Sequence, residues 1–256
     1  MRILINGICG HMGREVLALC RAGYRGAECV GGVDAFAAGN EDFTVYKSFS
    51  ELPDAEIDCI VDFSHHTVTP ALLDFAVERR LPTVLCTTGH TPEEKLKIAE
   101  ASEIVPIFFS ANMSLGVALL VELAKQTAKA FPEAEIEIIE KHHDRKIDAP
   151  SGTALMLADA LCEVRKNATV ACGRSGQGKR TPEEIGVHAI RMGNIVGEHE
   201  VMIGTQNQTI TLKHEAHSRA LFAEGALAAA DFLVGCEPGV YDMKSLVSGV
   251  KTPQKV

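Results

Sequence analysis

Short apolar runs alternate with amphipathic stretches through the first 113 residues. Residues 12–22 carry apolar side chains at positions 12, 16, 17, 19 and 20, a spacing that puts them on one face of a helix. A helix is expected to begin at Thr91, because Pro92 takes its first position and two glutamates follow in its first turn. Strands alternating with helices predict a parallel sheet with right-handed crossovers. The expected strands are 2–6, 27–33, 57–63, 83–86 and 105–109, and the other expected helix is 70–79.

The pattern changes after residue 113 to one typical of an α+β segment. Residues 135–140 alternate, with Ile136 and Ile138 on one face, as in a half-buried strand. Two further strands, 199–203 and 209–214, flank a short polar connection and predict an antiparallel hairpin. We therefore expect a second sheet, either antiparallel or mixed. The expected helices here are 114–130, 153–165 and a last helix at 219–233, and 174–184 is expected to be an exposed loop.

Composition narrows the function classes. The chain has 256 residues, of which 46% are apolar and 23% charged, which excludes a disordered chain and predicts one large domain or two modest ones. The formal net charge of −9 argues against a nucleic-acid partner, because such proteins present a basic face. The longest apolar run, 115–124, is interrupted by Glu122 and is shorter than the roughly 18 residues of a membrane span.

The cysteines bear on the compartment. All eight lie outside C-x-x-C pairs, and most are inside apolar segments, as Cys59 is. This distribution is typical of small buried side chains in a reducing compartment rather than of a disulfide framework. The first residues lead directly into a strand and lack the pattern of a signal peptide. We therefore expect a cytoplasmic protein.

Three glycines join the first strand to the first helix. Gly7, Gly10 and Gly13 would let backbone amides approach a pyrophosphate, which the helix N-terminus would also attract. Asp34 follows the second strand, where a carboxylate binds a ribose 2′-hydroxyl in dinucleotide-binding folds. Cys9 takes the place of the usual middle glycine, and a plain tight turn is the alternative interpretation. The order of strand, turn, helix, strand and acid favours a Rossmann-type dinucleotide site.

Asp34 also bears on the choice of cofactor. Its charge would repel a 2′-phosphate, and the next residues, Ala35 to Ala37, include no cation to accept one. The sequence therefore predicts that NADH is preferred, with NADPH as the alternative cofactor. The competing interpretation is that Asp34 only caps a turn.

The densest chemistry lies in residues 140–154, Glu-Lys-His-His-Asp-Arg-Lys-Ile-Asp-Ala-Pro-Ser-Gly-Thr-Ala. This segment follows a strand and enters a helix whose start, at Ser151, Gly152 and Thr153, would form a second anion site. Histidine and lysine side chains suit general acid chemistry. His142 and His143 have no suitably spaced third ligand, so we expect no metal. A solvated charged loop is the remaining alternative, but it leaves the paired histidines beside a helix start unexplained.

Residues 140–154 closely resemble the signature of the 4-hydroxy-tetrahydrodipicolinate (dihydrodipicolinate) reductase family. Further matches to that family follow in order along essentially the whole chain. They are 7–13, 61–64, 86–89, 110–117, 184–188, 195–201 and 214–219.

The resemblance implies a role for each matched position. His142 would be the proton donor or acceptor and Lys146 a second proton donor. Substrate carboxylates would be held by His143, Gly152 and Thr153, and Ser151 at the helix start is also expected to bind the substrate. The residues implied to line the dinucleotide are Gly7, Ile8, Cys9, Gly10, His11, Met12, Asp34, Cys86, Thr87, Thr88, Ser110, Ala111, Asn112 and Met113.

The family resemblance also implies an organisation and a reaction. Residues 1–113, completed by 218–256, would form the dinucleotide-binding domain, and 114–217 a substrate-binding domain whose sheet builds a homotetramer. The enzyme would use NADH or NADPH to reduce a cyclic dicarboxylate imine, with loss of water, in lysine and diaminopimelate biosynthesis. Two rival functions remain: a related reductase acting on another small dicarboxylate, such as an amino-acid dehydrogenase, and a dinucleotide sensor without catalysis.

Overall fold

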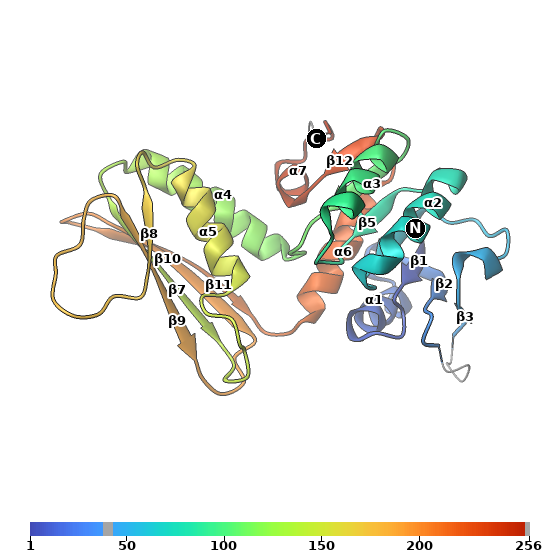
Figure 1. Cartoon of the computed structure of the whole chain (residues 1–256), viewed down its shortest axis with the longest axis horizontal. Coiled ribbons are helices and arrows are strands. Elements are labelled where there is room, and N and C mark those ends of the chain that lie inside the picture. The colour runs from blue at the N-terminus through green and yellow to red at the C-terminus, as the bar shows by residue number, and fades with distance from the viewer. Residues whose placement is uncertain (38–42, 254–256) are drawn as a thin grey trace. The chain divides into compact units, whose positions relative to one another are not determined.

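The computed structural model describes residues 1–37 and 43–253, which form two compact units. Unit 1 comprises Met1–Leu115 and Ala220–Val256, and unit 2 comprises Gly116–Arg219 (Figure 1). The chain therefore leaves unit 1 once and completes it with its C-terminal segment.

Unit 1 is built on a seven-stranded sheet in the order β12-β6-β5-β4-β1-β2-β3. Each neighbouring pair is parallel, as the alternation of strands and helices predicted. The strand order reverses between β1 and β4, and ligands bind beyond the carboxyl ends of the strands at such a point. The strands are β1 Arg2–Asn6, β2 Glu28–Val33, β3 Val45–Tyr46, β4 Cys59–Asp62, β5 Thr83–Leu85, β6 Pro106–Phe109 and β12 Gly239–Tyr241.

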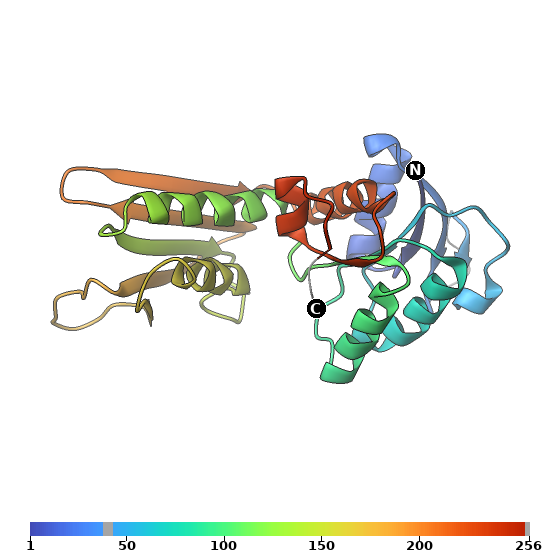
Figure 2. The same ribbon diagram turned by 90° about the horizontal axis from the view of Figure 1, so that it is seen from above.

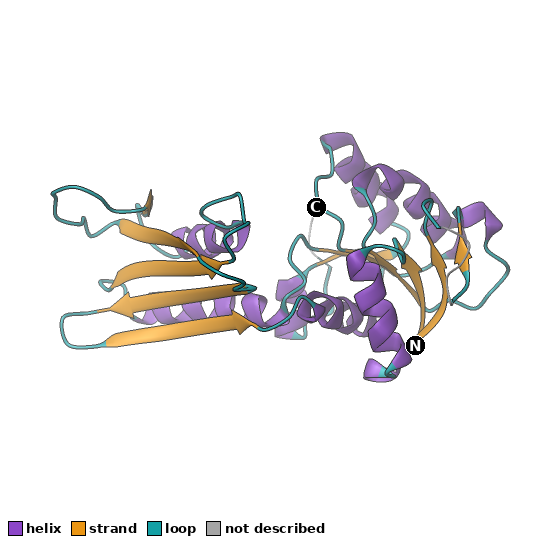
Figure 3. Cartoon of the chain, turned by 90° about the horizontal axis from the view of Figure 1, so that it is seen from below, coloured by secondary structure: helices purple, strands orange, loops and turns teal. Residues whose placement is uncertain are grey.

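Helices cover both faces of this sheet (Figure 3). The pair α1 and α6 packs on one face, and α2 and α3 pack together on the other (Figure 2). Buried apolar residues of α2, α3 and the strands, such as Leu72, Ile98 and Ile60, fill the second interface. The helices are α1 His11–Arg21, α2 Thr69–Arg79, α3 Pro92–Ser102, α6 Ala220–Leu233 and α7 Met243–Ser248, with single 3-10 turns at Tyr24–Gly26, Phe49–Glu51 and His66–Val68.

Unit 2 contains a five-stranded sheet in the order β11-β10-β7-β9-β8. The first two pairs are antiparallel and the last two are parallel, so the sheet is mixed. The hairpin of β10 and β11 was predicted, and its strands run side by side (Figure 2). The elements are α4 Leu115–Ala130, β7 Glu135–His142, α5 Gly152–Cys162, β8 Thr169–Cys172, β9 Glu184–Arg191, β10 Gly197–Gly204 and β11 Thr209–Ala216.

The alternation along β7 decides which polar side chains enter the interior of unit 2. Ile136 and Ile138 are fully buried beneath α4 and α5, and the same face continues through Glu140 and His142. On β10, His199 pairs with Glu140 in the antiparallel register and is also buried. The period of two that buries the isoleucines therefore carries a carboxylate and two imidazoles into the same layer.

Several elements differ from the sequence-based expectation. The helix ending at Leu233 is not the last, since β12 and α7 follow it. The strands β3, β8, β9 and β12 were not predicted either; three of them have four residues or fewer, and β9 includes Gly186 and His188 in place of a continuous apolar run. Such segments become strands by pairing with an existing sheet, which local pattern does not report.

The cysteines are less uniformly buried than expected. Cys20, Cys59 and Cys86 are buried, Cys172 is exposed and the other four are half-buried; all eight are free thiols. Burial raises the pKa of Cys20 to about 12, which keeps that thiol protonated and unreactive at neutral pH. Among the described residues, no helix has the length and apolarity that crossing a membrane would take.

Candidate active site

The glycine loop between β1 and α1 is tightly packed. Gly7 has a φ of +78°, and a Cβ added to it would lie 2.7 Å from the carbonyl oxygen of Phe63. At Gly13 an added Cβ would lie 2.2 Å from the carbonyl oxygen of Gly7. Gly10 caps α1 without a side chain, so the helix N-terminus stays open. These positions require glycine, and they leave backbone amides accessible at a helix start.

Asp34 lies against this loop, as its position after β2 predicted. Its Oδ2 accepts a hydrogen bond from the amide of Cys9 at 3.0 Å, and Oδ1 accepts one from the amide of Phe36 at 3.0 Å. The carboxylate therefore both caps the local turn and is tied to the glycine loop. Cys9, in place of the middle glycine, contributes its backbone to this contact.

A cavity of 510 Å³ opens at the carboxyl ends of β1, β2 and β4. Three predicted cofactor residues line it, namely Gly7, Gly10 and Asp34. Lys47 and His65 line it as well and were not predicted. Lys47 follows β3, which was not recognised as a strand, so nothing in its local sequence pointed to this cavity. The rest of the lining is Asn6, Val33, Ala35, Phe36, Ser48, Phe49, Phe63, Ser64, Thr67, Val68 and Ala71.

The other predicted cofactor residues lie outside the lining of this cavity. The Ile8 side chain is fully buried against Gly32, and only its backbone faces the loop. His11 and Met12 begin α1, and Cys9 meets Asp34 through its amide. Two further predicted segments follow β5 and β6 and therefore lie along the same carboxyl edge of the sheet. They are Cys86, Thr87 and Thr88 after β5, and Ser110, Ala111, Asn112 and Met113 after β6.

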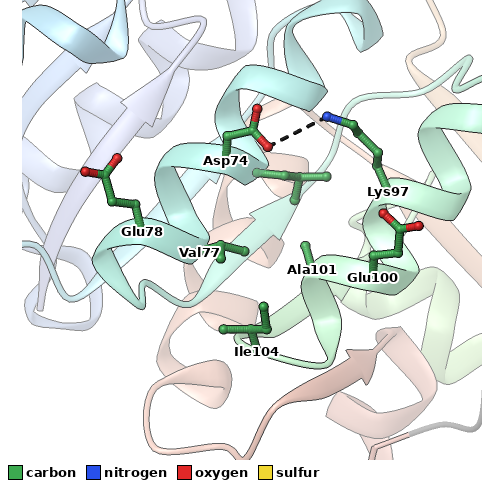
Figure 4. A pocket seen from close by; sticks show the side chains of 8 residues that line it. Asp74, Val77, Glu78, Lys97, Glu100, Ala101 and Ile104 are labelled. Atoms are coloured by element: carbon green, nitrogen blue, oxygen red, sulfur yellow. Dashed lines mark ion pairs between the residues drawn. The ribbon is translucent and has the colours of Figure 1, made fainter.

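A second hollow of 340 Å³, between α2 and α3, has a different character (Figure 4). Its floor is apolar and its rim carries three carboxylates and Lys97, which lies 3.7 Å from Asp74. An acidic rim repels the phosphates of a dinucleotide, so this hollow does not compete with the cavity at the strand ends. Its lining is Leu73, Asp74, Val77, Glu78, Lys97, Glu100, Ala101 and Ile104.

In unit 2 the segment rich in histidine joins β7 to α5. Ser151 caps α5, with its hydroxyl accepting from the amide of Ala154 at 3.2 Å and lying 3.1 Å from Nε2 of His199. The amide of Ser151 donates to Glu140 at 2.9 Å. The polar groups of this buried serine are thus engaged within unit 2. Gly152, by contrast, opens the helix where an added Cβ would meet nothing within 4 Å.

Glu140 is the centre of a buried polar network that sequence reasoning missed. Arg191 donates to both carboxylate oxygens, at 2.7 Å to Oε1 and 2.8 Å to Oε2. His142 donates through Nδ1 to Oε2 at 2.6 Å. Burial by itself would raise the pKa of Glu140, but the hydrogen bonds from Arg191, His142 and the Ser151 amide outweigh it and lower that pKa. Glu140 is therefore an anion inside the protein.

His199 extends this network. Its ring meets that of His142 edge to face, with 5.2 Å between centroids. Burial, reinforced by the neighbouring charge of His142, lowers the pKa of His199 to about 4. His199 is thus neutral at physiological pH and can donate or accept a hydrogen bond without adding charge.

Cationic groups gather around the predicted catalytic loop. Lys146 forms an ion pair with Asp148 at 2.9 Å. Burial and the nearby charges of Arg145 and Arg219 lower the pKa of His143, so this ring is a neutral donor among cations. The structure therefore brings His142, His143 and Lys146 together, and adds Arg219, to which the sequence assigned no role.

Comparison with known proteins identifies the family. The models described as "Dihydrodipicolinate reductase, N-terminus" and "Dihydrodipicolinate reductase, C-terminus" match residues 1–113 and 116–247. A 4-hydroxy-tetrahydrodipicolinate reductase from Caldanaerobacter subterraneus subsp. tengcongensis is 45% identical, covering 96% of this chain and 98% of the relative. The corresponding protein of Clostridium tetani is 42% identical, covering 97% of each.

Solved structures agree on the fold. A dipicolinate-bound dihydrodipicolinate reductase from Paenisporosarcina sp. TG-14 superposes with a TM-score of 0.80 at 23% identity, covering 94% of this chain and 97% of the other. A C. glutamicum DAP dehydrogenase in complex with DAP superposes with a TM-score of 0.60 at 14% identity, covering 100% of this chain and 96% of the other. By sequence over nearly its full length, this chain belongs to the 4-hydroxy-tetrahydrodipicolinate reductase family of oxidoreductases.

Proposed function

We propose that this enzyme uses a nicotinamide dinucleotide to reduce 4-hydroxy-tetrahydrodipicolinate to tetrahydrodipicolinate, with loss of water, in lysine and diaminopimelate biosynthesis. The observation that carries the proposal is the combination of full-length family membership with the buried His142–Glu140 pair beside the start of α5. In this scheme unit 1 binds the dinucleotide and unit 2 binds the dicarboxylate substrate.

The residues of unit 1 fit a dinucleotide. The positions where a Cβ would collide, Gly7 and Gly13, keep the loop close to the sheet, and the uncapped start of α1 supplies amides and a positive dipole for a pyrophosphate. The bound dinucleotide supplies a hydride. The residues proposed to hold it are the loop Gly7, Ile8, Cys9, Gly10, His11 and Met12, with Asp34, Cys86, Thr87, Thr88, Ser110, Ala111, Asn112 and Met113 along the carboxyl edge.

We keep NADH as the preferred cofactor, because the Asp34 carboxylate is anchored beside the loop and would repel a 2′-phosphate. Lys47 lines the same cavity and offers that phosphate a counter-charge, which supports turnover with NADPH as well. Lys47→Met should lower kcat/KM for NADPH severalfold and leave that for NADH nearly unchanged. The matched control is Lys97→Met, in the hollow between α2 and α3. A strong NADPH preference of the wild-type enzyme would refute the argument from Asp34.

Unit 2 has to bind the two carboxylates of the substrate and to supply a proton. The start of α5, at Gly152 and Thr153, and the neutral ring of His143 among cations are proposed to bind its two carboxylates. His142 and Lys146 are proposed to stabilise the negative charge that develops toward the ring nitrogen and to supply the proton. Ser151 is proposed to support this site by holding Glu140, because its own polar groups are engaged.

The decisive assay follows NADH oxidation with substrate freshly generated by the preceding synthase. His142→Ala and Lys146→Ala should each lower kcat by roughly 10²–10⁴-fold, the usual contribution of a general acid. Lys166→Ala, a change just beyond α5, should behave as wild type. A panel of other small dicarboxylates tests the rival reductases, and NADH binding without any turnover would identify a dinucleotide sensor.

We further propose that the enzyme is cytoplasmic, on the pattern of its cysteines, and that it is a homotetramer, as the family resemblance implies. In its support, α4 and α5 cover one face of the unit 2 sheet, and side chains such as Ile139 and Met202 remain half-exposed on the other. A second copy of the chain would bury this face. Light scattering on the eluted enzyme should give four chains, and a monomer at working concentration would refute the assignment.

A further inference from the structure

The geometry points to Glu140 as the positioning residue of the proposed proton donor: its buried carboxylate, locked by Arg191, orients the His142 ring and supplies its counter-charge. The inference rests on the proposed function, in which His142 handles the proton. Glu140 acts through the imidazole rather than on the substrate.

The hydrogen bonds fix which ring nitrogen of His142 carries a permanent proton. An ionised carboxylate only accepts, so the 2.6 Å contact with Oε2 requires a proton on Nδ1. The other oxygen, Oε1, is held by Arg191 and by the amide of Ser151, which prevents the carboxylate from rotating away. His142 is therefore confined to one tautomer when neutral and one orientation throughout.

The second ring nitrogen is the one left for chemistry. Among the described residues, Nε2 of His142 has no hydrogen-bond partner, and it faces Gly197, where an added Cβ would lie 3.1 Å away. A proton on Nε2 can pass to the substrate while Nδ1–H stays with Glu140. The ring then returns to neutral, and the next proton comes from solvent, so the step balances without another group.

The charges around the ring make the pH dependence predictable. Glu140 contributes the negative charge from β7, Arg191 a positive one from β9, and the neutral His199 faces the ring from β10. His214 on β11, His143 and the Lys146–Asp148 pair of the loop are further titratable groups near this layer. Removing the carboxylate leaves the imidazolium beside uncompensated cations, whereas removing the guanidinium leaves it beside an anion.

A second Glu–His–Arg set on the opposite face of the same sheet provides the control. Glu137 lies 2.9 Å from Nε2 of His188 and 3.4 Å from Nε of Arg180. It has the same composition, but its carboxylate is half-exposed and lies on the face of β7 opposite to Glu140 and His142. Glu137→Gln therefore removes an equivalent charge from the same strand without touching His142.

The experiment measures the pH profile of kcat for wild type, Glu140→Gln, Glu140→Asp, Arg191→Gln and Glu137→Gln. Glu140→Gln should lower kcat on the order of 10²-fold. It should also shift the alkaline limb of the kcat profile to lower pH by roughly 1–2 pH units, because the protonated ring loses its counter-charge. Arg191→Gln should shift that limb to higher pH, because the imidazolium then lies beside an anion without a competing cation. Glu140→Asp retains the charge and should keep the limb near its wild-type position at a reduced kcat. Glu137→Gln, shown by light scattering to keep the wild-type assembly, should match wild type.

Thermal unfolding and NADH binding establish that each variant is folded. If Glu140→Gln does not fold, the opposite shift in Arg191→Gln and the retained limb in Glu140→Asp still decide the question. An alkaline limb that stays in place in both Glu140→Gln and Arg191→Gln would overturn the inference and leave the pair a structural ion pair. Failure of the wild type to turn over the substrate would instead overturn the proposed function.

Discussion

Gly13→Ala sets two opposing effects against each other at the cofactor loop. Gly13 lies in the first turns of α1, where replacing glycine by alanine normally stabilises a helix by about 1 kcal/mol. Here, however, the new Cβ would lie 2.2 Å from the Gly7 carbonyl oxygen and 2.6 Å from the Cα of Ile8. Both are backbone atoms of the glycine loop, so the loop or the helix has to move.

The size of the effect follows from these distances. Real Cβ contacts stay beyond 3.0 Å, so the loop and helix must separate by nearly 1 Å. Overpacking of this kind costs about 1–3 kcal/mol, which offsets the gain in helix propensity and leaves a net destabilisation of up to about 2 kcal/mol. Because the displaced amides are those proposed to bind the pyrophosphate, the Kd for NADH should rise at least tenfold, or about 1.4 kcal/mol.

The measurement combines urea unfolding, followed by circular dichroism, with NADH titration followed by the fluorescence of the nucleotide itself. The chain contains no tryptophan, so the nucleotide signal is read against a low background. Ala18→Gly is the matched control, since Ala18 is exposed on α1 and its loss of about 1 kcal/mol in helix propensity leaves the loop untouched. It should lower stability while NADH binds as in wild type.

We expect the stability and the NADH affinity to fall together in Gly13→Ala, whereas only the stability should fall in Ala18→Gly. Gly10→Ala should give an intermediate result, because its Cβ would lie 3.2 Å from the Gly7 carbonyl oxygen. A Gly13→Ala enzyme that is more stable than wild type and binds NADH equally well would refute the argument that this position holds the loop against the helix.

Three further outcomes are expected. Because the pKa of His199 is lowered to about 4, the unfolded chain binds a proton below pH ~6.5 that the folded protein does not bind until about pH 4. The free energy of unfolding of the wild type should therefore fall by up to about 3 kcal/mol between pH ~6.5 and 4. In His199→Asn, urea unfolding at several pH values should show a weaker dependence of that free energy on pH. Gly197→Ala should lower kcat without changing NADH affinity, because its Cβ would crowd Nε2 of His142; unchanged steady-state kinetics would contradict this. Thr91→Ala removes one half of the capping box with Glu94 and should cost about 1 kcal/mol in urea unfolding, with no change in kcat.

Local pattern was sufficient for elements that carry their own signals. The start of α3 shows this, since Thr91, Pro92 and Glu94 are a cap, a fitting first residue and a reciprocal partner within four positions. The glycine loop is another case, because the positive φ of Gly7 and the close approach of the first turn of α1 at Gly13 both arise within seven consecutive residues. Signals of this kind lie within a few consecutive residues, and α1, β1 and the start of α3 were accordingly predicted to within about a residue.

Other features arise from pairing between distant segments. Arg191 reaches Glu140 because β9 pairs with β7, and His199 faces it because of the register between β10 and β7. Lys47 enters the cofactor cavity through a two-residue strand that exists only beside β2. The residues near each of these side chains in the sequence do not indicate which distant residue it contacts.

The sequence alone determined the family, the parallel sheet of unit 1, the glycine loop with Asp34, and the cluster of His142, His143 and Lys146. Each of these features depends on residues that are close together in the chain or on the periodic spacing of apolar residues along strands and helices. Only the tertiary structure decided that Glu140 is a buried anion, that Ser151 holds it, and that Arg191 compensates it. The physical reason is that burial and electrostatic partners are properties of strand register and sheet order, which bring together side chains about fifty positions apart.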